Sequence, residues 1–133
     1  MATSTKYTYG LGRRKSATAR ARLMKGKGDI VINDKPAEEY LCGNKTLLAE
    51  VTDPLALIGK QKEFDVSVKV SGGGMAGQVD AIKLAISKAI ITEASDLRPV
   101  LKKAGLLKRD PREKERKKYG LRSARKKEQF SKR

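Results

Sequence analysis

The charged residues of this chain are segregated into a nearly neutral middle and two strongly cationic ends. Residues 1–28 carry eight basic side chains and no acidic one, whereas residues 101–133 carry fifteen basic and four acidic side chains. Residues 29–100 carry eight basic and eleven acidic side chains, and the whole chain has a net charge of +16. The middle can fold by ordinary apolar burial, but the ends repel themselves unless a polyanion neutralises them. This pattern predicts a compact body whose cationic ends bind a polyanion.

A nucleic acid is the polyanion that this pattern favours, and an anionic membrane surface is the rival. No apolar stretch approaches the length of a membrane-spanning helix, and the opening MATSTKYTYG lacks the apolar core of a secretory signal. The single cysteine, Cys42, allows no internal disulfide, which is typical of a reducing compartment. We expect Cys42 to be a small buried residue rather than a nucleophile. These features favour a nucleic-acid partner and no membrane.

The residue types that most enzymes need for catalysis are missing or unpaired. The chain contains no histidine, which removes the commonest general base near neutral pH and the commonest metal ligand. The acidic residues form no recognisable acid–base pair, and the serines and threonines have no partner that would activate them as nucleophiles. We therefore expect no catalytic residue, no metal site and no cofactor, and we predict that the chain is not an enzyme.

Alternation of apolar and polar residues predicts three strands in the body. Residues 16–24 place three alanines and a leucine on one face and Arg20 and Arg22 on the other, as in a half-buried strand. Residues 29–33 are a second apolar stretch, and the glycine-containing turn before them predicts a hairpin with the first strand. Residues 64–70 alternate valines with polar residues in the same way.

Helical spacing of apolar residues predicts one long helix and several shorter ones. The long helix covers residues 75–93. Asp53 and the proline after it predict the start of a short helix that ends at a glycine, residue 59. A further short helix is predicted from Ser95 to the glycine at residue 105, and a polar helical turn over residues 110–120. The body is therefore expected to contain both strands and helices.

Apolar residues almost disappear after Leu107. Such a segment cannot bury enough apolar area to order itself, so we expect it to order on a partner. We therefore predict a compact RNA-binding domain, residues 1–107, followed by an extended basic arm, residues 108–133.

The glycine-rich stretch GGGMAG, residues 72–77, fits the G-x-G-x-x-G pattern of dinucleotide-binding proteins, because it follows a strand and opens a helix. The strand before it alternates, however, whereas a buried parallel strand is almost wholly apolar. No second strand is predicted after the helix, and Gln78 stands where a Walker lysine would follow. A tight strand-to-helix turn is the favoured interpretation. A nucleic-acid phosphate resting on the helix N-terminus stays open as an alternative.

A cluster of cations near the start of the chain is the best candidate for phosphate contacts in the body. The flanking glycines let the backbone approach a partner, and arginine forks and lysine point charges suit phosphate recognition. The candidate residues are Arg13, Arg14, Lys15, Arg20 and Arg22. Tyr7 and Tyr9 are candidates for stacking on bases, or else they are core or edge residues.

Three segments, taken in order, carry a resemblance to a known family. They read YGLGRRKSATARARL near the start, GGGMAGQVDAIKLAISKAI in the middle and RDPREKERKKYGLRSARKKEQFSKR at the end. Together they resemble the family of the ninth protein of the small ribosomal subunit, of the bacterial or organellar type. The resemblance extends over nearly the whole chain, from Tyr7 to Arg133.

This resemblance implies more than the residues alone predict. The family has a small α/β domain of the two-layer, α+β sandwich type. It contains a four-stranded sheet with helices packed on one face, a left-handed crossover and an extended basic C-terminal arm. Its members are structural constituents of the small ribosomal subunit, located in the head on the 3′ domain of the ribosomal RNA, beside neighbouring head proteins. The arm reaches the anticodon region of the P-site tRNA. The implied location is a cytoplasmic ribosome, or the ribosome of an organelle.

The resemblance also assigns roles to residues by position. Arg13, Arg14, Lys15, Arg20 and Arg22 are expected to contact ribosomal RNA from the body. The expected ribosomal RNA contacts of the arm are Arg109, Arg112, Arg116, Lys117, Lys118, Arg122 and Arg125. Ser131, Lys132 and Arg133 are expected to lie next to the tRNA. A stand-alone nucleic-acid-binding or architectural protein is the alternative function, because it would share the same electrostatics without a ribosome.

Overall fold

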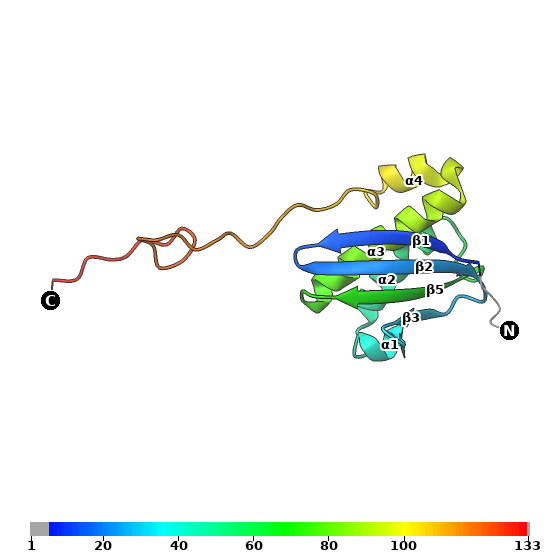
Figure 1. Ribbon diagram of the computed structural model, residues 1–133, viewed down its shortest axis with the longest axis horizontal. Helices are drawn as coiled ribbons and strands as arrows, with labels where there is room; N and C mark the ends of the chain where they lie inside the picture. Colours follow the sequence, from blue (N-terminus) through cyan, green and yellow to red (C-terminus); the bar gives the residue numbers. More distant parts are fainter. Residues whose placement is uncertain (1–5, 133) are drawn as a thin grey trace.

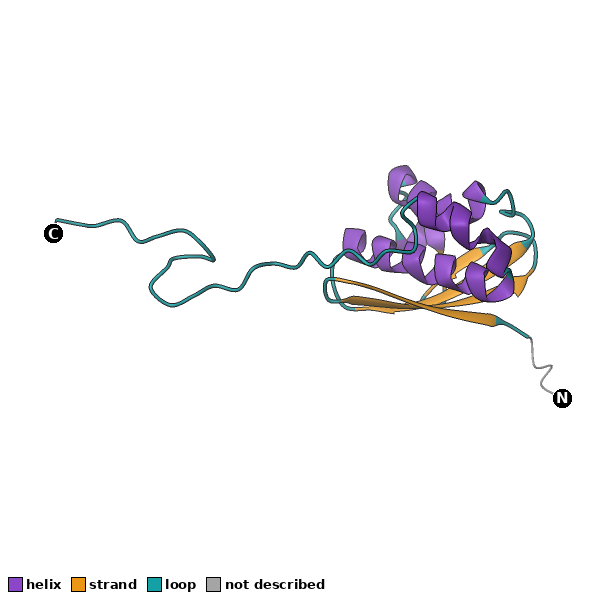
Figure 2. Ribbon diagram, turned by 90° about the horizontal axis from the view of Figure 1, so that it is seen from above, coloured by secondary structure: helices purple, strands orange, loops and turns teal. Residues whose placement is uncertain are grey.

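Five strands and a set of helices form two layers in the computed structural model, which describes residues 6–132 (Figures 1 and 2). The strands are β1 (Thr8–Arg14), β2 (Ala17–Lys25), β3 (Ile30–Ile32), β4 (Lys35–Pro36) and β5 (Phe64–Ser71). The helices are α1 (Ala37–Tyr40), α2 (Lys45–Leu57), α3 (Met75–Glu93), the 3₁₀ turn η1 (Ser95–Leu97) and α4 (Arg98–Lys103). All helices cover one face of the sheet, which confirms the predicted two-layer α/β class (Figure 2).

The sheet has the strand order β1-β2-β5-β3-β4. β2 pairs antiparallel with β1 on one side and with β5 on the other. The predicted hairpin between residues 16–24 and 29–33 is therefore wrong, because β5 lies between these two strands. Strand β1 was not predicted at all, since its two glycines hide the alternation. β5, rather than β3, lies next to β2, because all eight residues of β5 pair with β2, whereas β3 has only three residues.

A single carboxylate explains why the chain leaves β2 instead of turning back on it. One oxygen of Asp65, near the start of β5, accepts three backbone hydrogen bonds from the loop after β2. The donors are the N–H groups of Lys27, Gly28 and Asp29, at 2.8, 2.9 and 3.0 Å. These donors, the N–H of Asp29 first, hold the pKa of the Asp65 carboxyl below its usual value of 3.8. The loop is thereby tied to β5 and carries the chain past it to β3.

β3 and β5 run parallel, and the chain between them crosses the helical face through α2. Figure 1 shows β5 above β3, with the connection passing behind the sheet, which makes the crossover left-handed, as the family resemblance implied. The sheet has five strands rather than the expected four. The additional strand is β4, two residues long, which pairs with the edge of β3.

Helix α3 packs directly on the backbone of β1. A Cβ atom on Gly12 would lie 1.9 Å from the carbonyl oxygen of Ala81, and one on Gly10 would lie 2.0 Å from that of Ala85. Glycine in a strand commonly marks such a close backbone approach. The two glycines were predicted to admit an external partner, but the structure shows that they accommodate α3.

The segment before β5 differs from its prediction at two points. α2 begins at Lys45, where the side chain of Asn44 accepts hydrogen bonds from the N–H groups of Thr46 and Leu47. The predicted start at Asp53 is wrong, because that residue lies inside a helix that packs against α3. Cys42 is exposed, with a φ of +55°, so the prediction of a buried cysteine is also wrong. By contrast, the predicted bounds of α3 are confirmed.

Candidate nucleic-acid interface

The face of the sheet that the helices leave uncovered is cationic. Residues directly opposite each other on antiparallel strands share a face of the sheet. Arg20 lies opposite Leu11 of β1 and Lys69 of β5, and Arg22 lies opposite Tyr9. Arg20, Arg22 and Lys69 are all exposed. We define the cationic sheet face as Tyr7, Tyr9, Arg13, Arg20, Arg22 and Lys69.

Two tyrosines lie among these cations. The guanidinium carbon of Arg22 lies 4.9 Å from the centroid of the Tyr7 ring, which is a cation–π distance. Tyr7 is 47% exposed and Tyr9 is 48% exposed, so both rings belong to the surface rather than the core. Lys69 was not predicted as a site residue, because only the pairing of β5 with β2 brings it beside Arg20. Its ammonium group forms an exposed ion pair with Asp34 at 2.9 Å, so the arginines supply most of the unneutralised charge.

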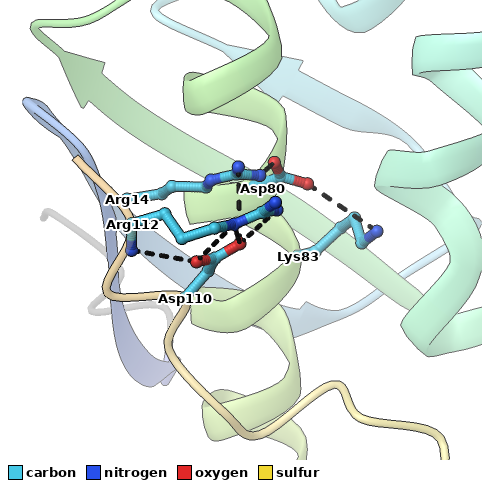
Figure 3. Close-up of polar contacts among 5 residues, drawn as sticks. All are labelled: Arg14, Asp80, Lys83, Asp110 and Arg112. Carbon is cyan, nitrogen blue, oxygen red and sulfur yellow. Dashed lines mark hydrogen bonds and ion pairs between the residues drawn. The ribbon is translucent and has the colours of Figure 1, made fainter. Parts of the chain in front are cut away.

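Arg14 lies on the opposite face of β1, where it joins a cluster that we call the Arg14 latch: Arg14, Asp80, Lys83, Asp110 and Arg112 (Figure 3). The guanidinium of Arg14 donates to the carboxylate of Asp80 on α3 and lies 3.4 Å from that of Asp110. Lys83 lies 3.9 Å from the second oxygen of Asp80. Two side-chain nitrogens of Arg112 donate hydrogen bonds to the carboxylate of Asp110, at 2.9 and 2.7 Å. The latch therefore ties the first residues of the arm to β1 and α3.

The three consecutive cations Arg13, Arg14 and Lys15 lie in different surroundings. Arg13 is exposed, and Lys15 lies in the β1–β2 turn with a φ of +51°. The side chain of Arg14 is only 19% exposed, and its Nε atom is buried without a hydrogen-bond partner among residues 6–132. Alternation along the strand places Arg13 and Arg14 on opposite faces. The three cations therefore do not form one patch, and the role of Asp80 and Asp110 was not visible in the sequence.

The latch makes the root of the arm sensitive to acid. The side-chain and backbone N–H groups of Arg112, the side chain first, hold the pKa of the Asp110 carboxyl well below its usual value of 3.8. Because the charged form is favoured in the folded protein, the contribution of the latch to stability is complete above pH 3.8. It declines below that value and is lost as the pH falls through the lowered pKa. We expect NMR to show the Asp110 carboxyl titrating below 3.8, and the R112A variant to bring its pKa back toward 3.8. An unchanged pKa in that variant would contradict the role of Arg112.

The remaining predicted site residues lie along the arm, which leads away from the domain beyond α4 (Figure 1). No helix forms over residues 110–120 of the described chain, so that prediction is wrong. A helix that is polar all round has no face to pack, and here the N–H of Arg112 bonds to the side chain of Asp110 instead. Of the ribosomal RNA contacts predicted along the arm, Arg109, Arg112, Arg116, Lys117, Arg122 and Arg125 are exposed. Lys118 is partly buried, Ser131 and Lys132 are exposed, and Arg133 lies outside the described residues.

The glycine-rich turn connects β5 to α3, as predicted. Gly72 and Gly73 have φ values of +76° and +67°, and a Cβ atom on Gly72 would lie 2.4 Å from the carbonyl oxygen of Ser16. Packing against the β1–β2 turn thus explains these glycines. The strand before the turn is antiparallel to β2, and within residues 94–132 no strand joins the sheet. The dinucleotide-binding interpretation therefore fails, whereas the phosphate alternative stays a prediction.

Within residues 6–132, no helix is long and apolar enough to cross a membrane. The same residues contain no cluster of three or more acidic, cysteine or histidine side chains placed to hold a metal ion.

The fold and the distribution of charge define the chain as a small α/β protein with two cationic surfaces, one on its sheet and one along its arm. Comparison with known proteins gives the family: the chain belongs to the ribosomal protein S9/S16 family, which it matches over residues 12–133. It is 56% identical to the small ribosomal subunit protein uS9 of Solidesulfovibrio magneticus, over 98% of this chain and 99% of that protein. It is 51% identical to the protein of the same name from Synechococcus sp. (strain JA-2-3B'a(2-13)), over 94% of this chain and 92% of that protein. The chain is thus a structural, non-enzymatic ribosomal protein.

Proposed function

We propose that this protein is a structural constituent of the small ribosomal subunit and binds its ribosomal RNA through two surfaces. Its relatives are small-subunit proteins, and it covers nearly their whole length. The observation that carries the proposal is that most of the exposed arginines lie away from the helices. The helices cover one face of the sheet, and exposed arginines occupy the other face and the arm. Phosphate binding by these arginines relieves the self-repulsion of the cationic ends.

The residues of the body have different roles in this proposal. Arg13, Arg20 and Arg22 contact phosphates from the cationic sheet face, and Lys15 contacts them from the neighbouring turn. Tyr9 offers a half-exposed ring to a base. Arg14 acts by orienting the arm rather than by touching RNA, because its guanidinium is already held by Asp80 and Asp110.

The arm extends the binding surface beyond the domain. Its cations follow the 3′ domain of the ribosomal RNA in the head of the subunit, beside neighbouring head proteins. Ser131, Lys132 and Arg133, at its end, lie next to the anticodon region of the P-site tRNA. An extended segment with few apolar residues suits this role, because it exposes almost every cation to a partner. The protein acts in the ribosomes of the cytoplasm or of an organelle.

Cosedimentation tests the proposal against a stand-alone nucleic-acid-binding function. The tagged protein is expected to remain with small subunits after a high-salt wash that strips non-specifically bound cationic proteins. Its affinity for small-subunit 3′-domain RNA is expected to exceed its affinity for duplex DNA at the same salt concentration. Recovery only in the ribosome-free pool, with equal affinity for the two nucleic acids, would support the stand-alone function instead.

A further inference from the structure

The arm closes on itself between Glu115 and Lys127, and this closed loop is visible in Figure 1. The carboxylate of Glu115 accepts from the ammonium of Lys118 through one oxygen and from Nε of Arg125, at 2.7 Å, through the other. The N–H of Arg122 donates to the carbonyl oxygen of Lys126 at 2.8 Å. Leu121 and Lys127 form an antiparallel bridge at the neck of the loop. We call residues 115–127 the arm hook.

A single acidic residue allows this cationic segment to close. The arm hook contains seven basic residues and only one acidic residue, Glu115. Its carboxylate pairs with cations from both sides of the loop, which offsets the repulsion between them. Gly120 has a φ of +77°, a left-handed conformation that glycine adopts without steric cost and that the turn requires. The ammonium of Lys118 also donates to the carbonyl oxygen of Ala124 at 3.3 Å.

The arm hook hides its small apolar residues and exposes its only aromatic one. Leu121 and Ala124 are partly buried. Tyr119, next to the turning glycine, is 98% exposed. Arg116 and Lys117, just before it, are also exposed. An exposed aromatic side chain beside exposed cations is the combination that binds unpaired nucleotides. The aromatic ring stacks on the base, and the cations attract the phosphates.

We propose that Tyr119 is a base-stacking residue, and that the arm hook presents it to an unpaired nucleotide of the ribosomal RNA. This inference rests on the proposed function, because it names the kind of RNA structure that the arm contacts. A protein partner is disfavoured, since the exposed cations around the ring would have to be desolvated against it. The role of Glu115 is positioning: it holds the loop in the form that points the ring outward.

Three substitutions of Tyr119 in the full chain separate stacking from other roles. The probe is small-subunit 3′-domain RNA in a filter-binding assay at fixed salt. We expect Y119A to weaken binding by about tenfold, within the range measured for base–aromatic stacking. Y119F, which keeps the ring, is expected to bind within about twofold of the wild type, and Y119L, which keeps only apolar bulk, to lose nearly as much as Y119A. The salt dependence is expected to stay unchanged, because no charge is removed.

A positioning role for Glu115 predicts coupling between the two residues. E115Q removes the charge that closes the arm hook, so the loss caused by Y119A is expected to shrink in the E115Q background. Full affinity of Y119A, full affinity of Y119L, or equal losses in both backgrounds would overturn the inference while leaving the proposed function intact. Failure of the wild-type protein to prefer this RNA over duplex DNA would overturn the proposed function itself.

Discussion

Replacing Gly12 by alanine is expected to lower the free energy of unfolding by about 3 kcal/mol, a large part of the stability of a small domain. The added Cβ would lie 1.9 Å from the carbonyl oxygen of Ala81 and 2.6 Å from the amide nitrogen of Ala85. Both atoms belong to the backbone of α3, so no side-chain rotation relieves the clash. β1 and α3 must move apart, which opens the core beneath them and displaces Arg14 from Asp80.

Urea unfolding followed by circular dichroism measures this effect. Gly74→Ala is the matched control, because no atom from another part of the fold lies within 4 Å of the position its Cβ would take. Gly74 is the N-cap of α3 and has a φ of −90°, so alanine there is expected to cost under about 1 kcal/mol. Equal stability of the two variants would show that α3 does not need the close approach to β1.

Removing the arm after Leu107 is expected to reduce affinity for small-subunit 3′-domain RNA by about a thousandfold or more at moderate salt. Residues 108–133 carry thirteen basic and four acidic side chains, almost half of the basic residues of the chain. If they neutralise about six phosphates, the slope of log affinity against log salt should become shallower by about four units. The cationic sheet face alone should retain weak binding.

Deleting only residues 131–133 is the matched control for this truncation. So short a deletion should leave the affinity for ribosomal RNA nearly unchanged, but it should weaken retention of tRNA in the P site of reconstituted subunits. The domain should stay folded in both variants, because Arg14 keeps its contact with Asp80 when Asp110 is lost. If the protein without its arm kept the RNA affinity and the salt dependence of the full chain, the arm would have no role in binding and the sheet face would account for all of it.

The two cationic surfaces are joined through the Arg14 latch. Arg14 lies at the end of β1, one residue from Arg13 on the cationic sheet face, and it contacts Asp110 at the root of the arm. The arm therefore leaves the domain at the same end as the β1–β2 turn (Figure 1). An RNA that contacts Lys15 in this turn is thus close to the path of the arm. This arrangement suits one continuous RNA partner better than two independent ones.

Local periodicity was enough to predict the elements that bury one face. β2, β5 and α3 follow the predicted ranges closely, because alternating or helically spaced apolar residues form each of them. β1 and the start of α2 were missed, each for its own reason. In β1, Gly10 and Gly12 take the positions where apolar side chains would show the alternation. In α2, the start signal of Asp53 and its proline is overridden by the cap at Asn44 and by packing on α3.

The sequence by itself determined that the body is neutral, that both ends are cationic and that no histidine-based chemistry is available, since these properties depend only on which residues are present. Only the tertiary structure decided which cations act together. Pairing of β2 with β5 brings Lys69 beside Arg20, and β-strand alternation turns Arg14 away from Arg13 into the latch. Charge adds along a chain, whereas a binding surface depends on strand register and helix packing, which join residues far apart in sequence.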